Sequence, residues 1–295
     1  MGLKEDSFKN HEEIPVDSWE EFQHKLRELQ KECSERKKKT HLYESDFLYR
    51  GEGNSSWELF TTLERYTYKC FTFSEYYQTI SKIKSQIESF TGSHWDIRNI
   101  DEYKKWAKQN NTEMLYFDQT SQKEFVDEYR YMAYLRHHGF PSPLLDWTSS
   151  PYVAAYFAFA GIPNIYSDQR PKRVSVYVYQ QYQRGRRSCT DNPFIHVMSP
   201  YIQMHRRHFL QQSQYTICIS YSGSLGGWRY EWHENAFFRE KDRVVWKFTI
   251  PSSEYRKVLH QLEAYNLNAY SLYGSEESLM ETLALRALNL SENRT

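Results

Sequence analysis

Three separated segments of the chain carry polar side chains of the types that build catalytic or binding sites. Arg50 and Gly51 end a short strand-like run, Asp146 lies between apolar neighbours ahead of an apolar helix, and Gln212 occupies a later polar segment. An isolated buried carboxylate is too costly to keep ionised, so Asp146 requires a partner. Arg50 is the best candidate, and we expect the two side chains to pair although they lie far apart in the chain.

The residues on either side of this acid predict a strand, a turn and a buried helix. Pro141 and Pro143 prevent the preceding helix from continuing. The hydroxyls of Thr148 and Ser149, with the serine that follows, offer N-caps directly ahead of Pro151, a residue that suits the first helical position. The helix that begins there has almost no polar face, so we expect it to be buried.

Together these segments resemble the FRG family, which is named for a Phe/Tyr-Arg-Gly motif. The resemblance covers roughly residues 41 to 290. The matching segments are Tyr49-Arg50-Gly51, Trp57 to Arg65, the signature from His138 to Thr148 with the Ala-Ala-Tyr-Phe-Ala helix after it, and, more weakly, Gln211 to Thr216. The chain departs from the usual family pattern at Arg136, Ser142-Pro143 and Ser213, where members usually carry Gln, Thr-Arg and Gly.

The order of these features is similar to that of ADP-ribosyltransferases, which use NAD. A guanidinium suits the pyrophosphate of NAD, an aromatic ring suits nicotinamide, and a carboxylate stabilises the positive charge that builds as the C–N bond breaks. The analogy assigns catalytic roles to Arg50, His138, Asp146 and Gln212. It assigns NAD contacts to Arg50, Gly51, Trp147, Thr148, Ser149 and Tyr156, with Trp147 or Tyr156 stacking on nicotinamide.

Each of these residues also has a structural interpretation. Arg50 and Asp146 could form a buried clamp, Thr148 and Ser149 could only cap the helix, His138 could be a hydrogen-bonded core residue, and Gln212 could satisfy backbone at a strand edge. No metal is expected: His205 and His208 have helical spacing, but Arg206 and Arg207 between them would repel a cation.

Composition excludes several classes of protein. The 295 residues contain 38 acidic and 38 basic side chains, so the chain lacks the net positive charge that drives nonspecific nucleic-acid binding. Aromatic residues make up 17% of the chain, and we expect some to line a pocket or interface. Four widely separated cysteines predict reduced thiols and a cytoplasmic location. No apolar run approaches the ~18 residues of a membrane span.

The pattern along the chain predicts an α+β fold. Residues 1–40 form an arm and a helix, and residues 41–290 form the FRG domain with a helical insert at about 74–120. Helical periodicity dominates the first half, whereas residues after 170 alternate with period two. We expect a helix-rich N-terminal half packed on a mainly antiparallel or mixed sheet from the C-terminal half, in an ADP-ribosyltransferase-like arrangement.

These observations favour an NAD-using ADP-ribosyltransferase or NAD-cleaving effector, of the toxin or phage-defence type, that modifies an unknown protein or nucleic acid. The alternative is a noncatalytic recognition module that binds a protein or single-stranded nucleic acid through aromatic surface. A nuclease is disfavoured because the sequence shows no carboxylate cluster suited to Mg²⁺. Oligomeric state does not follow from the sequence.

Overall fold

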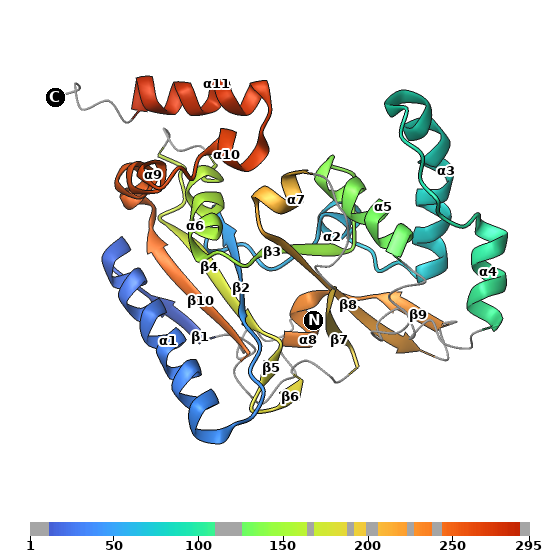
Figure 1. Ribbon diagram of the computed structural model, residues 1–295, viewed down its shortest axis with the longest axis horizontal. Coiled ribbons are helices and arrows are strands. Elements are labelled where there is room, and N and C mark those ends of the chain that lie inside the picture. The colour runs from blue at the N-terminus through green and yellow to red at the C-terminus, as the bar shows by residue number, and fades with distance from the viewer. Residues whose placement is uncertain are drawn as a thin grey trace, which may run out of the picture.

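The fold is organised by one mixed sheet (Figure 1). The computed structural model describes residues 12–109, 126–163, 168–187, 192–198, 206–222, 227–237 and 244–289. In these ranges the sheet has eight strands, in the order β1-β10-β4-β2-β3-β8-β7, with β9 paired to β8. All its pairs are antiparallel except that of β1 with β10. The strands are β1 (Glu12–Pro15), β2 (Phe47–Glu52), β3 (Leu144–Thr148), β4 (Arg173–Gln180), β7 (Phe194–Met198), β8 (Ser213–Ser222), β9 (Gly227–Tyr230) and β10 (Val245–Pro251); β5 (Tyr182–Gln183) and β6 (Arg186–Arg187) form a separate hairpin.

The sheet is nearly divided between β2 and β3. Along its length β2 pairs with β4, whereas it meets β3 at one position, where Tyr49 lies opposite Thr148. Beyond this pair the two strands diverge, and side chains rather than backbone hydrogen bonds must fill the gap. The split leaves one half of the sheet, around β4 and β10, joined to a second half around β8.

Helices from both ends of the chain cover the β4 half. The strand residues Val174, Val176 and Val178 share one core with the helices α1 (Trp19–Thr40), α6 (Pro151–Ala160), α9 (Tyr255–Ala264) and α10 (Ala269–Tyr273). Helix α11 (Glu276–Ala284) lies above them and continues into a π-helical turn, Leu285–Asn289. Helix α1 begins after Ser18, whose side chain caps it by accepting from the Glu21 N–H.

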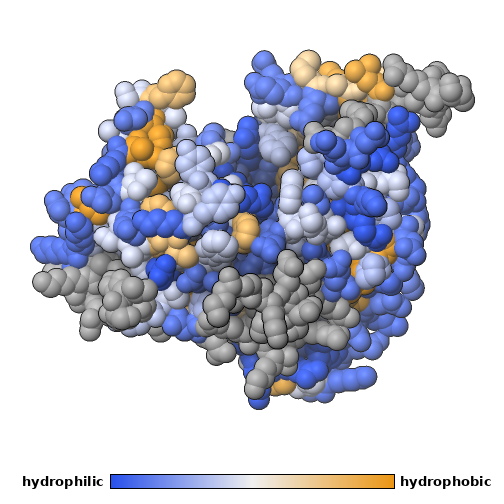
Figure 2. Space-filling model, turned by 180° about the vertical axis from the view of Figure 1, so that it is seen from behind, coloured by the Kyte–Doolittle hydropathy of each residue, from blue (hydrophilic) through white to orange (hydrophobic). Residues whose placement is uncertain are grey.

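A second helical group packs on the β8 half. It contains α3 (Phe73–Thr91), α4 (Ile100–Gln109) and α5 (Val126–His137), with the short α2 (Thr62–Thr67) nearby. Tyr77 of α3 stacks on Tyr103 of α4 with ring centroids 3.9 Å apart. These helices project on the side opposite α11, and Figure 2 shows a hollow in the upper edge of the molecule between the two projections.

The α+β class is confirmed, with local differences. Glu12–Pro15 forms β1, where we expected only an arm, and the strands expected around Arg50 and Asp146, β2 and β3, lie within the sheet that we expected from the C-terminal half. The segment expected as a helical insert at about 74–120 contains α3 and α4, and Asn99 caps α4 by accepting from the N–H groups of Asp101 and Glu102. The remainder of that segment, from residue 110, lies outside the described residues.

Two further findings concern the whole described chain. None of its helices combines the length and the apolar character that crossing a membrane requires. The described cysteines Cys33, Cys70 and Cys218 are free thiols, and Cys189 lies outside the described residues.

Candidate functional site

A cavity of about 340 Å³ opens where β2 and β3 diverge. Its walls come from both halves of the sheet and from the helices α5, α6, α7 (Arg206–Leu210) and α10. We call this cavity the cleft. Its polar lining residues are Arg50, Arg136, His137, Asp146, Thr148, Arg207, Gln211 and Ser213, and its aromatic ones are Tyr49, Trp147, Phe157, Tyr215 and Tyr273.

Arg50 bridges the diverging strands. Its Nη1 donates to the Asp146 carbonyl oxygen at 2.8 Å and lies 3.1 Å from the Asp146 carboxylate. The other side of the guanidinium contacts the buried Glu52 at 2.7 Å, and Glu52 also accepts from Arg65 at 3.2 Å. The expected pairing of Arg50 with Asp146 is therefore present, and it replaces the strand pairing that the split removes.

Asp146 is held by a second guanidinium, that of Arg136, whose Nη2 donates to the same carboxylate oxygen. Burial disfavours the charged form of Asp146, but the charges of Arg136 and Arg50 outweigh it and hold the pKa of the carboxyl well below its usual value. The Asp146 side chain keeps 42% of its surface exposed, so the ionised acid faces the cleft. A permanently charged carboxylate at this position can stabilise a developing cation.

The opposite wall adds a third guanidinium and two aromatic rings. Arg207 of α7 lies over the ring of Tyr273 at 5.6 Å, and Tyr273 lies edge-on to Phe157 of α6 at 6.2 Å. Three guanidinium groups therefore line the cleft with one carboxylate. Even with Glu52 counted behind Arg50, positive charge is in excess, which suits a phosphate or carboxylate ligand.

A tyrosine hydroxyl between two histidines lies in the same cleft. Tyr215 is fully buried, and its hydroxyl is 2.5 Å from His137 Nε2 and 3.4 Å from His208 Nδ1. Burial, and then the charge of Asp146, raises the pKa of Tyr215, whereas burial lowers the pKa of His208. At neutral pH the tyrosine is therefore protonated and can donate a hydrogen bond.

Two of the expected site residues have structural roles that are clear from their surroundings. A Cβ on Gly51 would lie 1.9 Å from the Ala154 carbonyl oxygen, so glycine allows β2 to approach α6 closely. The Thr148 hydroxyl donates to the Gln211 carbonyl oxygen at 2.7 Å and accepts from the Ser150 N–H at 3.1 Å. Both residues line the cleft, but they shape it rather than offer free polar groups.

The structure places two of the four predicted catalytic residues outside the cleft lining. His138 is exposed and packs against Tyr134, because α5 ends at His137 and the chain turns there. Gln212 is exposed in a left-handed turn, and its carbonyl oxygen accepts from the Ser149 N–H. Their immediate neighbours line the cleft instead: His137 contacts Tyr215, and Gln211 donates to the Leu272 carbonyl oxygen.

Two of the predicted NAD contacts lie outside the cleft lining, and a third borders the cleft but directs its ring elsewhere. Trp147 lines the cleft, but its side chain points to the face opposite Asp146, packs with Leu145 and Tyr177, and donates to Thr216. The exposed Ser149 does not line the cleft, and the N-cap of α6 is Ser150. Tyr156 faces a different cavity beneath α11. Its neighbour Phe157 lines the cleft instead, together with Tyr273.

The sequence pattern therefore missed Arg136, His137, Arg207, Tyr215 and Tyr273. Arg136 carried a signal, because it is one of the departures from the usual family pattern. His137 ends α5, one residue before the predicted His138, and the other three come from α7, β8 and α10, whose positions depend on strand order rather than on local sequence. Among the described residues, no group of three or more His, Cys, Asp or Glu side chains is arranged to hold a metal ion, and His205 lies outside them.

Comparison with known families identifies an FRG domain. Residues 45–164 match the model of this domain, and the matched stretch begins just before β2 and ends after α6. No curated protein and no solved structure matches the chain. The match contains Arg50, Arg136 and Asp146, whereas Arg207, Tyr215 and Tyr273 lie downstream of it.

Proposed function

We propose that the cleft binds a phosphate-bearing nucleotide, with NAD as the leading candidate, and that the protein is an ADP-ribosyltransferase or NAD-cleaving enzyme acting on a macromolecule. One observation carries the proposal: Arg50, Arg136 and Arg207 converge on a cleft that also presents an ionised Asp146. An effector role of the toxin or phage-defence type and a cytoplasmic location belong to the same proposal and rest on the family resemblance and on cysteine usage.

The charges in the cleft support a dinucleotide as the ligand. A pyrophosphate would receive forked hydrogen bonds from guanidinium groups that already line the wall. The rings of Tyr273 and Phe157 offer an apolar surface for a flat heterocycle, in place of Trp147 and Tyr156. A cavity of about 340 Å³ takes part of such a ligand, and the remainder would extend into the opening.

Asp146, Tyr215 and His137 are the groups in the cleft that would take part in the cleavage of NAD. Breakage of the ribose C1′–N bond sends the electron pair to nicotinamide and leaves positive charge on the ribose, which a nucleophile then attacks. Asp146 would stabilise that charge through its ionised carboxylate. The Tyr215 hydroxyl, hydrogen-bonded to His137, would donate to an oxygen of the bound ligand or relay a proton from it.

The decisive experiment measures nicotinamide released from NAD by the purified protein and by two variants of neighbouring arginines. Arg207→Ala removes a guanidinium that lines the cleft, and Arg206→Ala removes an exposed one that does not. We expect Arg207→Ala to lower kcat/KM at least about tenfold, and Arg206→Ala to match the parent protein. Equal rates for both variants, or calorimetry in which NAD does not bind, would contradict the proposal.

A noncatalytic recognition module is the second candidate, and exposed aromatic residues favour it. Tyr66 and Tyr68 at the end of α2 are 78% and 77% exposed, and Phe209 on α7 is 80% exposed. Such rings suit stacking on bases or insertion into a partner surface. In this case NAD would not be consumed, and Tyr66→Ala with Tyr68→Ala would weaken capture of a macromolecule while Arg207→Ala would not.

A further inference from the structure

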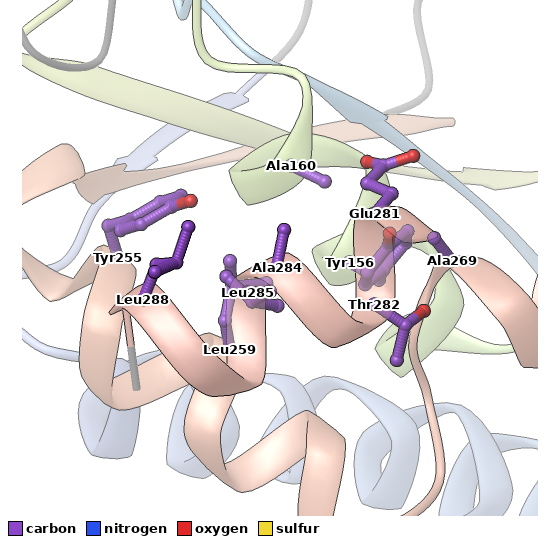
Figure 3. A pocket seen from close by; sticks show the side chains of 10 residues that line it. All are labelled: Tyr156, Ala160, Tyr255, Leu259, Ala269, Glu281, Thr282, Ala284, Leu285 and Leu288. Carbon is purple, nitrogen blue, oxygen red and sulfur yellow. The ribbon is translucent and has the colours of Figure 1, made fainter. Parts of the chain in front are cut away.

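A second cavity, of about 230 Å³, lies beneath α11 and is separate from the cleft. We call it the C-terminal cavity. Figure 3 shows side chains from α6, α9, α11 and the π-helical turn converging on it. Its lining is mostly apolar and includes Leu259, Ala269, Ala284, Leu285 and Leu288. Its volume falls below the roughly 300–1,000 Å³ of cavities that hold drug-sized molecules, so it suits a smaller ligand.

Two polar groups interrupt this apolar lining at one end. Tyr156 is 3% exposed, and Figure 3 shows its hydroxyl beside the side chains of Glu281 and Thr282. The Thr282 hydroxyl already donates to the Ser278 carbonyl oxygen and accepts from the Tyr270 N–H. With the residues that the structure describes, neither the Tyr156 hydroxyl nor the Glu281 carboxylate forms a hydrogen bond or an ion pair. Burial, with the nearby charge of Glu281, raises the pKa of Tyr156, so its hydroxyl stays protonated.

The arrangement has the features of a site for a small organic cation. A carboxylate at the entrance supplies the counter-charge, and the aromatic side chain of Tyr156 lies beside it (Figure 3). The leucines and alanines accept an apolar body. A purely apolar ligand would leave the Tyr156 hydroxyl buried without a partner, at the cost of its desolvation.

The backbone next to the cavity departs from regular α-helix. Helix α11 changes to a π-helical turn at Leu285, and Leu285 and Leu288 of this turn line the cavity. Such turns widen a helix locally and are frequent at functional sites. Glu281 and Ala284 before the change and Leu285 and Leu288 after it all line the cavity, so both parts of the helix contribute to its wall.

We propose that the C-terminal cavity is a binding site for a small amphipathic amine, whose ammonium group pairs with Glu281 and whose apolar body lies between Leu259 and Leu285. The ligand class is opposite in charge to the one proposed for the cleft. The inference does not depend on what the cleft binds.

The test compares 2-phenylethylamine with 2-phenylethanol, which has the same apolar body but no charge, by calorimetry and ligand-observed NMR on the full chain. We expect saturable binding of the amine at least about tenfold tighter than that of the alcohol. Glu281→Gln should remove this preference, whereas Glu276→Gln, an exposed change on the same helix outside the cavity, should keep it. Equal affinity of the parent protein for the two compounds would refute the proposal.

A second pair of variants tests the location. Ala284→Trp would fill the cavity, and Leu283→Trp would place the same ring on an exposed position that does not line it. Both positions are exposed on α11, so both proteins should fold, which circular dichroism would verify. We expect the first change to abolish amine binding and the second to leave it unchanged. Retained binding in Ala284→Trp, or no saturable amine binding by the parent protein, would overturn the assignment.

Discussion

The cleft and the C-terminal cavity share the helices α6 and α10 as walls, but they differ in whether their carboxylate has an ion-pair partner. On α6, Tyr156 lines the C-terminal cavity and the next residue, Phe157, lines the cleft. On α10, Ala269 lines the C-terminal cavity and Tyr273 lines the cleft. In the cleft, the carboxylate of Asp146 is held by two guanidiniums. In the C-terminal cavity, the carboxylate of Glu281 has no ion-pair partner among the described residues.

The difference separates charges that hold the fold from charges that are available to a ligand. Removal of Arg50 would leave Glu52 with Arg65 alone and Asp146 with Arg136 alone, because Arg50 is paired with both acids. Glu281 has no such partner among the described residues, so we expect its substitution to have little effect on folding. Four substitutions, ordered from the largest expected effect to the smallest, test this contrast.

Gly51→Ala should have the largest effect, because it acts on the shared wall itself. The added Cβ would meet the Ala154 carbonyl oxygen at 1.9 Å and the Ala158 nitrogen at 2.6 Å, so β2 or α6 must move. We expect the free energy of unfolding in urea to fall by more than about 3 kcal/mol. Gly92→Ala is the control, since Gly92 has a positive φ but open space around it, and should cost about 1 kcal/mol. Similar losses for the two would contradict the steric argument.

Arg50→Met should come next. The substitution keeps much of the side-chain volume, but it leaves the buried Glu52 with Arg65 as its guanidinium partner and removes the side-chain donor to the Asp146 carbonyl oxygen. Breaking a buried pair in this way costs about 3 kcal/mol in the free energy of unfolding. Arg65→Met removes the second guanidinium that contacts Glu52. Because the Arg65 side chain is 41% exposed, we expect this change to lower the free energy of unfolding by less than about 1 kcal/mol. A smaller loss for Arg50→Met than for Arg65→Met would show that the split in the sheet does not depend on Arg50.

Asp146→Asn should have an intermediate effect that depends on pH. Because the pKa of Asp146 is lowered in the folded protein, its stabilising contribution is fully present above the ordinary value of about 4 and is lost as pH falls further. At pH 7 we expect a loss of about 1–2 kcal/mol, since 42% of the side chain is exposed. Denaturation at a series of pH values should show a shallower acid limb for the variant than for the parent protein. If stability fell equally with decreasing pH in the variant and the parent protein, the ion pairs of Asp146 with Arg50 and Arg136 would not stabilise the fold.

Glu281→Gln should have the smallest effect on folding. The carboxylate is exposed and has no ion-pair partner among the described residues, so we expect the free energy of unfolding to change by less than about 0.5 kcal/mol. Thermal denaturation of the parent and variant proteins, side by side, measures this difference. A loss as large as that of Asp146→Asn would mean that Glu281 has a structural role, and the contrast between the two cavities would fail.

Local sequence was sufficient for the elements whose signals are local. Pro151 and the period-two runs after residue 170 predicted α6 and the strands β4, β8 and β10 within a few residues, and a helix was expected within residues 1–40, where α1 lies. The pairing of Arg50 with Asp146 followed from the cost of burying a lone acid. By contrast, Glu12–Pro15 gave no recognisable strand signal, because its place in the sheet comes from parallel pairing with β10 at the far end of the chain.

Site residues were harder to predict than elements, because a shift of one position reverses which way a side chain points. On β3, the Asp146 side chain faces the cleft, whereas Trp147 borders the cleft but packs its ring into the opposite core, so the two neighbours cannot both present their side chains to one ligand. At the end of α5 the same shift separates His137 from His138. Arg207, Tyr215 and Tyr273 depended on long-range topology that the sequence pattern does not contain.

Alternating charges run from the surface to the cleft through Arg65, Glu52, Arg50, Asp146 and Arg136. In such a row each guanidinium has a fixed number of donors to share. An anion that binds Arg136 would compete with Asp146 for the donors of that guanidinium, so a ligand in the cleft would change how the carboxylate is held. Because the row is continuous, the same change would reach Arg50 and Glu52.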